Sequence, residues 1–176
     1  MLKPAVLYKD ALPACWAKAS LDPRNRFYAE TYWNFENTVR ESNWESHQFV
    51  SVDSSDNIVG YISITIDRGC HFVRSLGVLR FDKSGKYDIL FARDFKEFFR
   101  LMFCYYKYQK MSFSVCIGSP HEKMYDRFCR KYGGRIVGIK KRNFRLMDGT
   151  ICDQKIYELL IEDFLKKAGD KLNGKD

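Results

Sequence analysis

The segment 87–109 constrains the fold more than any other, because it predicts one long helix between two apolar strands. Its large apolar side chains recur every three or four residues and form a single stripe: Phe91, Phe95, Phe98, Met102 and Tyr105. Strands are predicted on either side of it, at 72–81 and 111–117. A helix that joins two strands of one sheet makes a right-handed crossover and leaves the strands parallel. We therefore expect these two strands to be neighbours that diverge at one end.

A second informative stretch, KYGGRIVG at 131–138, predicts a helix that stops abruptly and a strand that starts at once. Pro120 suits the first turn of a helix over 120–132, and Gly133 suits the left-handed residue that closes it. The β-branched residues that follow predict a strand over 135–146. Asp148-Gly149 then predicts a tight turn into a last strand over 151–161.

The remaining segments complete the sheet. Strands are expected at 5–8, 47–52 and 58–66, and helices at 12–20 and 24–40, the second of them preceded by Asp22-Pro23. The predicted order is strand, helix, helix, three strands, helix, strand, helix and two strands. This is an α/β (α+β) fold with a mixed sheet of about seven strands, flanked by helices.

Length and composition favour one ordinary domain. The chain has 176 residues, 45% of them hydrophobic, and shows no internal repeat. We assign a single domain to 1–165 and expect the polar tail at 166–176 to fray. An export signal is not expected, since Lys9 and Asp10 interrupt the apolar stretch before Ala-Lys-Ala at 17–19. No apolar run approaches the length of a membrane span, so we expect no membrane partner.

The cysteines and histidines suggest neither a disulfide framework nor a metal site. Six cysteines, at 15, 70, 104, 116, 129 and 152, include no Cys-x-x-Cys pair and have no histidine at zinc spacing. Reduced thiols in a cytoplasmic protein are the simplest interpretation.

Positive charge is concentrated in one segment. The formal net charge of the chain is +8, and 121–145 holds nine lysines and arginines but only two acids, Glu122 and Asp126. Such a field attracts phosphates or an acidic partner. A solvated basic face and a single-stranded nucleic-acid surface remain alternatives.

The order of elements and the segment 118–158 resemble the GNAT superfamily of N-acetyltransferases. Members often show a helix ending in a Lys-x-Gly-Phe element, a Val-Gly near the start of the next strand, a hairpin, an Asp and a closing strand with a Tyr. Here these are Lys131-Tyr132-Gly133-Gly134, Val137-Gly138, Asp153 and Tyr157. Ser119-Pro120 stands where the family often has Asn-Pro. The resemblance implies a mixed-sheet acyltransferase that uses acetyl-coenzyme A.

The resemblance also implies where coenzyme A would bind. The family's phosphate loop follows the fourth strand, and its glycines let backbone N–H groups approach the pyrophosphate. The matching positions here, 84–89, form a divergent loop in which Tyr87 and Ile89 replace the glycines and Asp88 would lie close to the phosphates. The implied cofactor-binding residues are Val78, Leu79, Lys83, Ser84, Gly85, Lys86, Tyr87 and Ser119. Within these, the backbone N–H groups of Val78 and Leu79 would polarise the thioester carbonyl. No metal is implied.

Three residues are candidates for the chemistry. Tyr125 would protonate the departing thiolate, as a tyrosine of this helix does in the family. The usual spacing of that tyrosine falls on Cys129, and Tyr125, Cys129 and Tyr132 share one helical face that could equally pack on the sheet. Ser75 stands where many members carry a catalytic Glu, and would act through a water. The sequence offers three glutamates as the base that deprotonates the amine, Glu30, Glu36 and Glu41, and does not select one of them.

Three functions follow from these features. The first is an acyl-CoA-dependent N-acyltransferase, in which an unidentified amine attacks acetyl-coenzyme A directly in a ternary complex. The second is a catalytically inactive GNAT-like module that binds an acidic protein or nucleic acid through the basic segment. The third, with the least support, is a small nucleic-acid-binding protein, since no motif of that class occurs.

Overall fold

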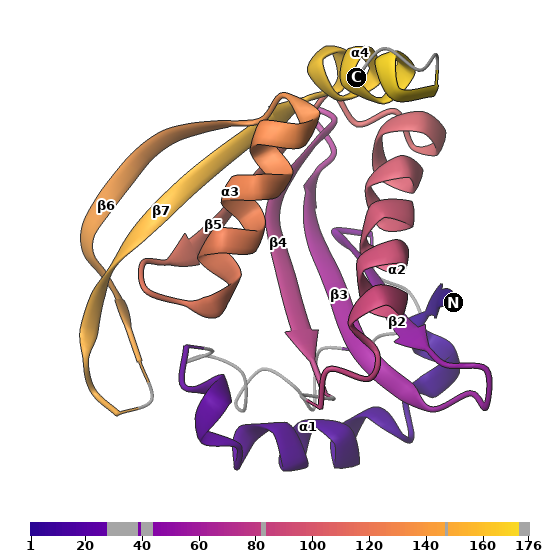
Figure 1. The fold of residues 1–176 in the computed structure, drawn as a ribbon, viewed down its shortest axis with the longest axis vertical. Coiled ribbons are helices and arrows are strands. Elements are labelled where there is room, and N and C mark those ends of the chain that lie inside the picture. Colours follow the sequence, from indigo (N-terminus) through magenta and orange to yellow (C-terminus); the bar gives the residue numbers. More distant parts are fainter. Residues whose placement is uncertain (28–38, 40–43, 82–83, 147, 173–176) are drawn as a thin grey trace.

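The computed structural model describes residues 1–27, 39, 44–81, 84–146 and 148–172. Seven strands form one mixed sheet in the order β1-β2-β3-β4-β5-β7-β6 (Figure 1). The strands are β1 (Leu2–Pro4), β2 (Ser46–Val52), β3 (Ile58–Asp67), β4 (Phe72–Arg80), β5 (Lys110–Cys116), β6 (Arg135–Arg145) and β7 (Ile151–Leu160). The α-helices are α1 (Leu12–Ser20), α2 (Asp88–Arg100), α3 (Pro120–Tyr132) and α4 (Ile161–Leu172). The predicted fold class is confirmed.

The crossover through α2 produces the parallel pair that the sequence predicts. Only two residue pairs, Phe72–Lys110 and Val73–Met111, lie in register between β4 and β5. Beyond them the two strands diverge (Figure 1). All other neighbouring strands of the sheet are antiparallel. The edge of β4 beyond Val73 therefore faces a gap in the sheet.

The long helix ends earlier than predicted. Four residues of its apolar stripe are buried, but Tyr105 is 73% exposed. After Arg100 the chain makes one π-helical turn, Leu101–Tyr105, closed by a hydrogen bond from Tyr106 N–H to Leu101 O at 2.9 Å. A π turn inserts an extra residue into the helical repeat. That insertion rotates Tyr105 off the buried stripe.

The switch from α3 to β6 is confirmed, and both glycines are needed there. Gly133 has φ +85° and closes α3 as a left-handed residue. Gly134 donates its N–H to Cys129 O at 2.8 Å. A Cβ on Gly134 would lie 2.8 Å from Cys129 Sγ. The first glycine supplies the backbone conformation, and the second lets β6 start against the helix.

Near the N-terminus, the structure can be compared with a predicted strand at 5–8 and a predicted helix at 24–40. Ala5–Tyr8 forms a 3₁₀ turn, and the strand is Leu2–Pro4, so the predicted strand at 5–8 is wrong. Ala5 is fully buried in the same cluster as Leu12 and Val50, whereas Leu7 is 70% exposed. Of the predicted helix at 24–40, Pro23–Asn25 is a single 3₁₀ turn capped by Asp22. Residues 28–38 and 40 lie outside the described residues.

The expected tail is partly helical. Helix α4 follows β7 directly and continues to Leu172, across residues that were expected to fray. Phe164 anchors it, with ring centroids 4.9 Å from Phe103 and 5.4 Å from Tyr132. Helices α2, α3 and α4 thus cover the main core on one face of the sheet. A smaller core lies on the other face, under α1.

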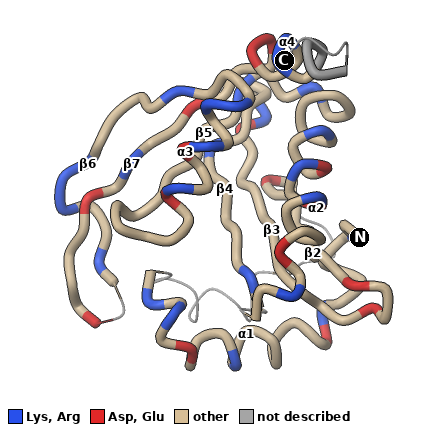
Figure 2. Tube along the Cα trace, viewed as in Figure 1, with Lys and Arg blue, Asp and Glu red and all other residues tan. Residues whose placement is uncertain are grey.

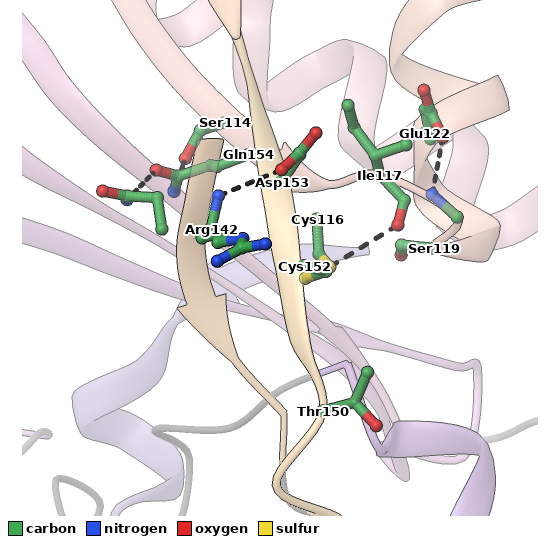
Figure 3. The surroundings of a disulfide bond; sticks show 12 residues. Ser114, Cys116, Ile117, Ser119, Glu122, Arg142, Thr150, Cys152, Asp153 and Gln154 are labelled. Atoms are coloured by element: carbon green, nitrogen blue, oxygen red, sulfur yellow. Dashed lines mark hydrogen bonds between the residues drawn. A yellow bond between two sulfur atoms is a disulfide. The ribbon is translucent and has the colours of Figure 1, made fainter. Parts of the chain in front are cut away.

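A disulfide joins Cys116 at the end of β5 to Cys152 on β7 (Figure 3). The two strands are antiparallel neighbours, and Cys116 lies opposite Gln154, two residues from its partner. The prediction that all thiols are reduced is therefore wrong for these two. Disulfides are rare in reducing compartments, so the cytoplasmic location stays a prediction without this support. No helix among the described residues is long and apolar enough to cross a membrane.

The disulfide makes a direct prediction about thiol content. Cys15, Cys70, Cys104 and Cys129 are free, so titration of unfolded, unreduced protein should find four thiols, and six after reduction. Reduction should lower the free energy of unfolding by about 2–4 kcal/mol, because the bridge closes a long loop in the unfolded chain. Cys116→Ala/Cys152→Ala is the control, and its melting temperature should not respond to reductant. Six thiols before reduction would contradict the pairing.

Candidate functional site

A pocket of about 760 Å³ lies between the facing sides of α2 and α3. Aromatic and aliphatic side chains make up its walls: Phe27, Phe91, Ala92, Phe95, Met124, Phe128 and Tyr132. One end is formed by Ser119, Pro120 and His121, which lead from β5 into α3. The volume is within the range of pockets that hold small ligands and cofactors.

The pocket is strongly basic. Five cations line it and one acid: Arg24, Arg80, Lys96, Arg127 and Lys131, with Asp88. Asp88 forms an ion pair with Arg80 at the start of α2, so its charge is already compensated. Arg127 and Lys131 come from the basic segment of the sequence, but Arg80 and Lys96 do not. A pocket with these walls suits a ligand that is anionic at one part and apolar at another.

Ser119 is the predicted cofactor residue that the pocket includes. It is 5% exposed and caps α3 by accepting a hydrogen bond from His121 N–H at 3.2 Å. Its own N–H donates to Cys116 O at 3.1 Å. The short turn between β5 and α3 therefore holds Ser119 and His121 in fixed positions at one end of the pocket.

Of the predicted phosphate loop at 84–89, only Asp88 lines the pocket. None of the described loop residues Ser84, Gly85, Lys86 and Tyr87 lines the pocket. Gly85 has φ +85° and open space around its Cβ position, and Lys86 N–H donates to Ser84 Oγ at 3.3 Å. The Tyr87 hydroxyl donates to Asp53 at 2.9 Å, which fixes the loop against the β2–β3 turn. Lys83 lies outside the described residues.

The two predicted backbone donors on β4 face opposite ways. The N–H of Phe81 donates to Val59 O on β3 at 2.9 Å. N–H groups alternate along a strand, and the register has no irregularity between 75 and 80. The Leu79 N–H therefore also faces β3, and the Val78 N–H faces the gap beside β5. Of these two residues, only Val78 has a backbone N–H that does not point at β3.

The three predicted catalytic residues do not line the pocket. Tyr125 is 4% exposed, and its ring packs against Phe113 and Tyr157 at 5.1 and 5.9 Å between centroids. Burial raises the pKa of Tyr125. Burial also raises the pKa of the Cys129 thiol, to about 12, so it is protonated at neutral pH. Ser75 is exposed and lies opposite Thr65 on β3.

His121 and Tyr132 are pocket residues that the sequence analysis did not select. His121 lies four residues before Tyr125, with ring centroids 6.5 Å apart. Residues on the buried face of α3 and residues on its pocket face both recur every three or four positions. Helical periodicity alone therefore does not tell the two faces apart. The signal that could have found His121 is its place directly after the cap of α3, at the open end of the β4–β5 pair.

Comparison with known proteins identifies this architecture. The sequence matches no protein-family model and no curated protein. A spermidine N-acetyltransferase from Vibrio cholerae, solved with CoA and spermine, has a TM-score of 0.75 at 16% identity, covering 94% of this chain and 97% of that one. The same organism's spermidine/spermine N-acetyltransferase SpeG, solved with manganese ions, has a TM-score of 0.70 at 14% identity, covering 96% of each chain.

A protein from T. thermophilus, provisionally described as an acetyltransferase, has a TM-score of 0.66 at 19% identity and covers 99% of this chain and 92% of that one. All three structures match across nearly the whole chain, although their sequences are far from this one. The match therefore concerns the arrangement of helices and strands. This chain has the fold of the GNAT acetyltransferases.

Proposed function

We propose that this chain is an acyl-CoA-dependent N-acyltransferase, most simply an N-acetyltransferase. The observation that supports this most directly is the basic, aromatic-walled pocket beside the open end of the β4–β5 pair. Its cations Arg80, Lys96, Arg127 and Lys131 suit the phosphates of coenzyme A, and its apolar walls suit the pantetheine arm. Acetyl-coenzyme A is a substrate in this scheme, and the Vibrio cholerae spermidine N-acetyltransferase that was solved with CoA and spermine is consistent with it.

The chemistry that this site suits is direct attack in a ternary complex. The nitrogen of a neutral amine forms a bond to the thioester carbonyl carbon, and the carbon–sulfur bond breaks to release the coenzyme A thiolate. The Val78 N–H, which faces the gap, would hydrogen bond to the carbonyl oxygen as it gains negative charge. An acyl-cysteine intermediate is disfavoured, because Cys129 is buried and protonated.

The amine loses a proton and the thiolate gains one. We propose His121 ahead of Tyr125 for this transfer, because His121 lines the pocket and an imidazole can both accept and donate a proton. Tyr125 lies behind it in the core. Ser75 is not favoured, because it does not line the pocket.

Calorimetry with acetyl-coenzyme A at low and high salt tests the proposal. We expect binding that weakens several-fold at high salt, since the divergent loop offers few backbone contacts and charged side chains carry more of the affinity. Release of coenzyme A thiol in the presence of a panel of amines would then identify the acceptor class. No binding at millimolar ligand would overturn the proposal.

A second candidate function is a GNAT-like module that binds an acidic protein or nucleic acid without catalysis. It is favoured by β6, an edge strand on which Lys140, Lys141, Arg142 and Arg145 are exposed. Figure 2 shows basic positions along this strand. Lys141 pairs with Asp153 at 2.7 Å, so part of this charge is compensated within the chain. Binding of an acidic polymer in the absence of any coenzyme A affinity would favour this function.

A further inference from the structure

Lys155 on β7 is the centre of a charged cluster behind the pocket, on the opposite side of α3. Its side chain is only 13% exposed and forms ion pairs with Glu122 and with Asp126, the latter at 3.2 Å. Glu122 and Asp126 are one turn apart on α3. A single lysine therefore ties the first two turns of this helix to the sheet.

Each carboxylate of the cluster holds a second group. Asp126 accepts a hydrogen bond from the Tyr157 hydroxyl at 2.7 Å. Tyr157 is fully buried and stacks on Phe113 of β5, with centroids 5.3 Å apart. Asp126 is thus fixed from β7 by both a lysine and a tyrosine. Tyr157, which the family resemblance singled out, serves here to orient a carboxylate.

Glu122 connects the cluster to the turn that forms one end of the pocket. Its Oε2 accepts the N–H of Gly118 at 2.8 Å, and Figure 3 shows this contact beside Ile117 and Ser119. Gly118 has φ +88°, so it sits at the bend of the turn. Ser119 and His121 follow immediately and line the pocket. A continuous chain of contacts therefore runs from Lys155 through Glu122 to the pocket.

The cluster also separates the charges of α3. The two acids of the helix face β7, where Lys155 compensates them, and Arg127 and Lys131 face the pocket. We propose that Lys155 is a positioning residue, which fixes the β5–α3 turn through Glu122 and keeps the acids of α3 directed away from an anionic ligand. The second half of this inference rests on the proposed function, and the first half does not.

The ionisation of the cluster supports this role. The hydrogen bond from Lys155, followed by that from Gly118, lowers the pKa of Glu122. For Asp126, burial opposes ionisation, but the hydrogen bonds from Tyr157 and Lys155 prevail and its pKa is lowered. A carboxylate with a lowered folded-state pKa stabilises the fold above its unfolded value, about 4.5 for Glu122, and this contribution is lost as the pH falls.

Hydrogen exchange of the Gly118 amide tests the positioning role without any ligand. In Lys155→Met, the released Glu122 should no longer hold this N–H, and its exchange should become at least about tenfold faster. Lys141→Met is the matched control, since Lys141 forms an ion pair on the same hairpin but is 78% exposed. It should leave Gly118 unchanged. Lys155→Arg should restore most of the protection.

Coenzyme A affinity and the pH dependence of melting complete the test. Lys155→Met should weaken binding by about threefold to thirtyfold and flatten the loss of stability below pH 4.5. In Lys155→Met/Glu122→Met neither a charge nor an acceptor for the Gly118 N–H remains at 122, so stability should partly recover while the turn stays untethered and affinity stays low. Recovery of both would mean that Lys155 acts through stability alone. Unchanged Gly118 exchange in Lys155→Met overturns the inference, whereas failure of the wild-type protein to bind overturns the proposed function.

Discussion

Replacing Arg127 and Lys131 with glutamate is expected to lower the affinity for coenzyme A by at least about a hundredfold. Both side chains line the pocket on the face of α3 turned toward α2. A hydrogen bond to a charged group contributes about 1.5–3 kcal/mol, and each 1.4 kcal/mol is tenfold in affinity. Losing two such contacts, with the charge reversed at both, supports this lower bound. Calorimetry measures the change, and circular dichroism checks that the fold is retained.

The matched control changes the same total charge on the same helix. Lys123 and Arg130 are exposed on α3 but do not line the pocket. Lys123→Glu/Arg130→Glu should weaken binding only about twofold to fivefold, through the long-range field that salt screens. Equal losses in the two double variants would mean that the basic segment acts as a diffuse surface. That outcome would favour the acidic-partner module over the enzyme.

The parts of the fold that the sequence predicts well are those in which local and long-range requirements agree. The stripe formed by Phe91, Phe95 and Phe98 predicts one buried helix face, and the apolar strands on either side of the helix predict a parallel pair. Gly133 could be placed because a left-handed residue after a helix has few alternatives. These signals are contained within short segments, so a single sequence is enough to interpret them.

The disulfide and α4 depend on neighbours that are distant in the sequence. Cys116 and Cys152 are 36 residues apart, and they meet only because β5 and β7 pair in one particular register. Helix α4 carries one buried aromatic, Phe164, in a polar segment that contains a glycine at 169. One buried aromatic residue is too little to predict that this helix packs on the core, unless its partners Phe103 and Tyr132 are already known.

The candidate site was predicted in outline but not in its residues. The gap between β4 and β5, Ser119 and the basic helix were expected, and they form parts of the pocket or border it. The rotation of α3 about its axis does not follow from periodicity. It turns Tyr125 and Cys129 into the core and His121 toward the pocket. Arg80 at the end of β4 and Lys96 on α2 meet at the pocket because α2 packs against the sheet, and no sequence motif indicates this.

Gly133→Ala is expected to lower the free energy of unfolding by about 2–5 kcal/mol. Left-handed backbone costs alanine about 1–2 kcal/mol. A Cβ at this position would also lie 2.9 Å from Asp163 Cβ and 3.3 Å from Asp163 O, at the start of α4. Overpacking of this kind costs about 1–3 kcal/mol, because a backbone oxygen cannot move as a flexible side chain can. Chemical denaturation of the purified variant measures the sum.

Gly149→Ala separates the two contributions. Gly149 has the same φ of +85°, but the nearest atom to its Cβ position is Arg145 Nη2, at 3.9 Å. This variant should lose only the conformational part, about 1–2 kcal/mol. The difference between the variants, about 1–3 kcal/mol, then measures the contact between the end of α3 and α4. That difference should also appear as a lower melting temperature in Gly133→Ala, by roughly 2–4 °C for each kcal/mol. Equal losses in the two variants would mean that α4 makes no tight contact with Gly133. The position of α4 would then depend on the packing of Phe164 alone.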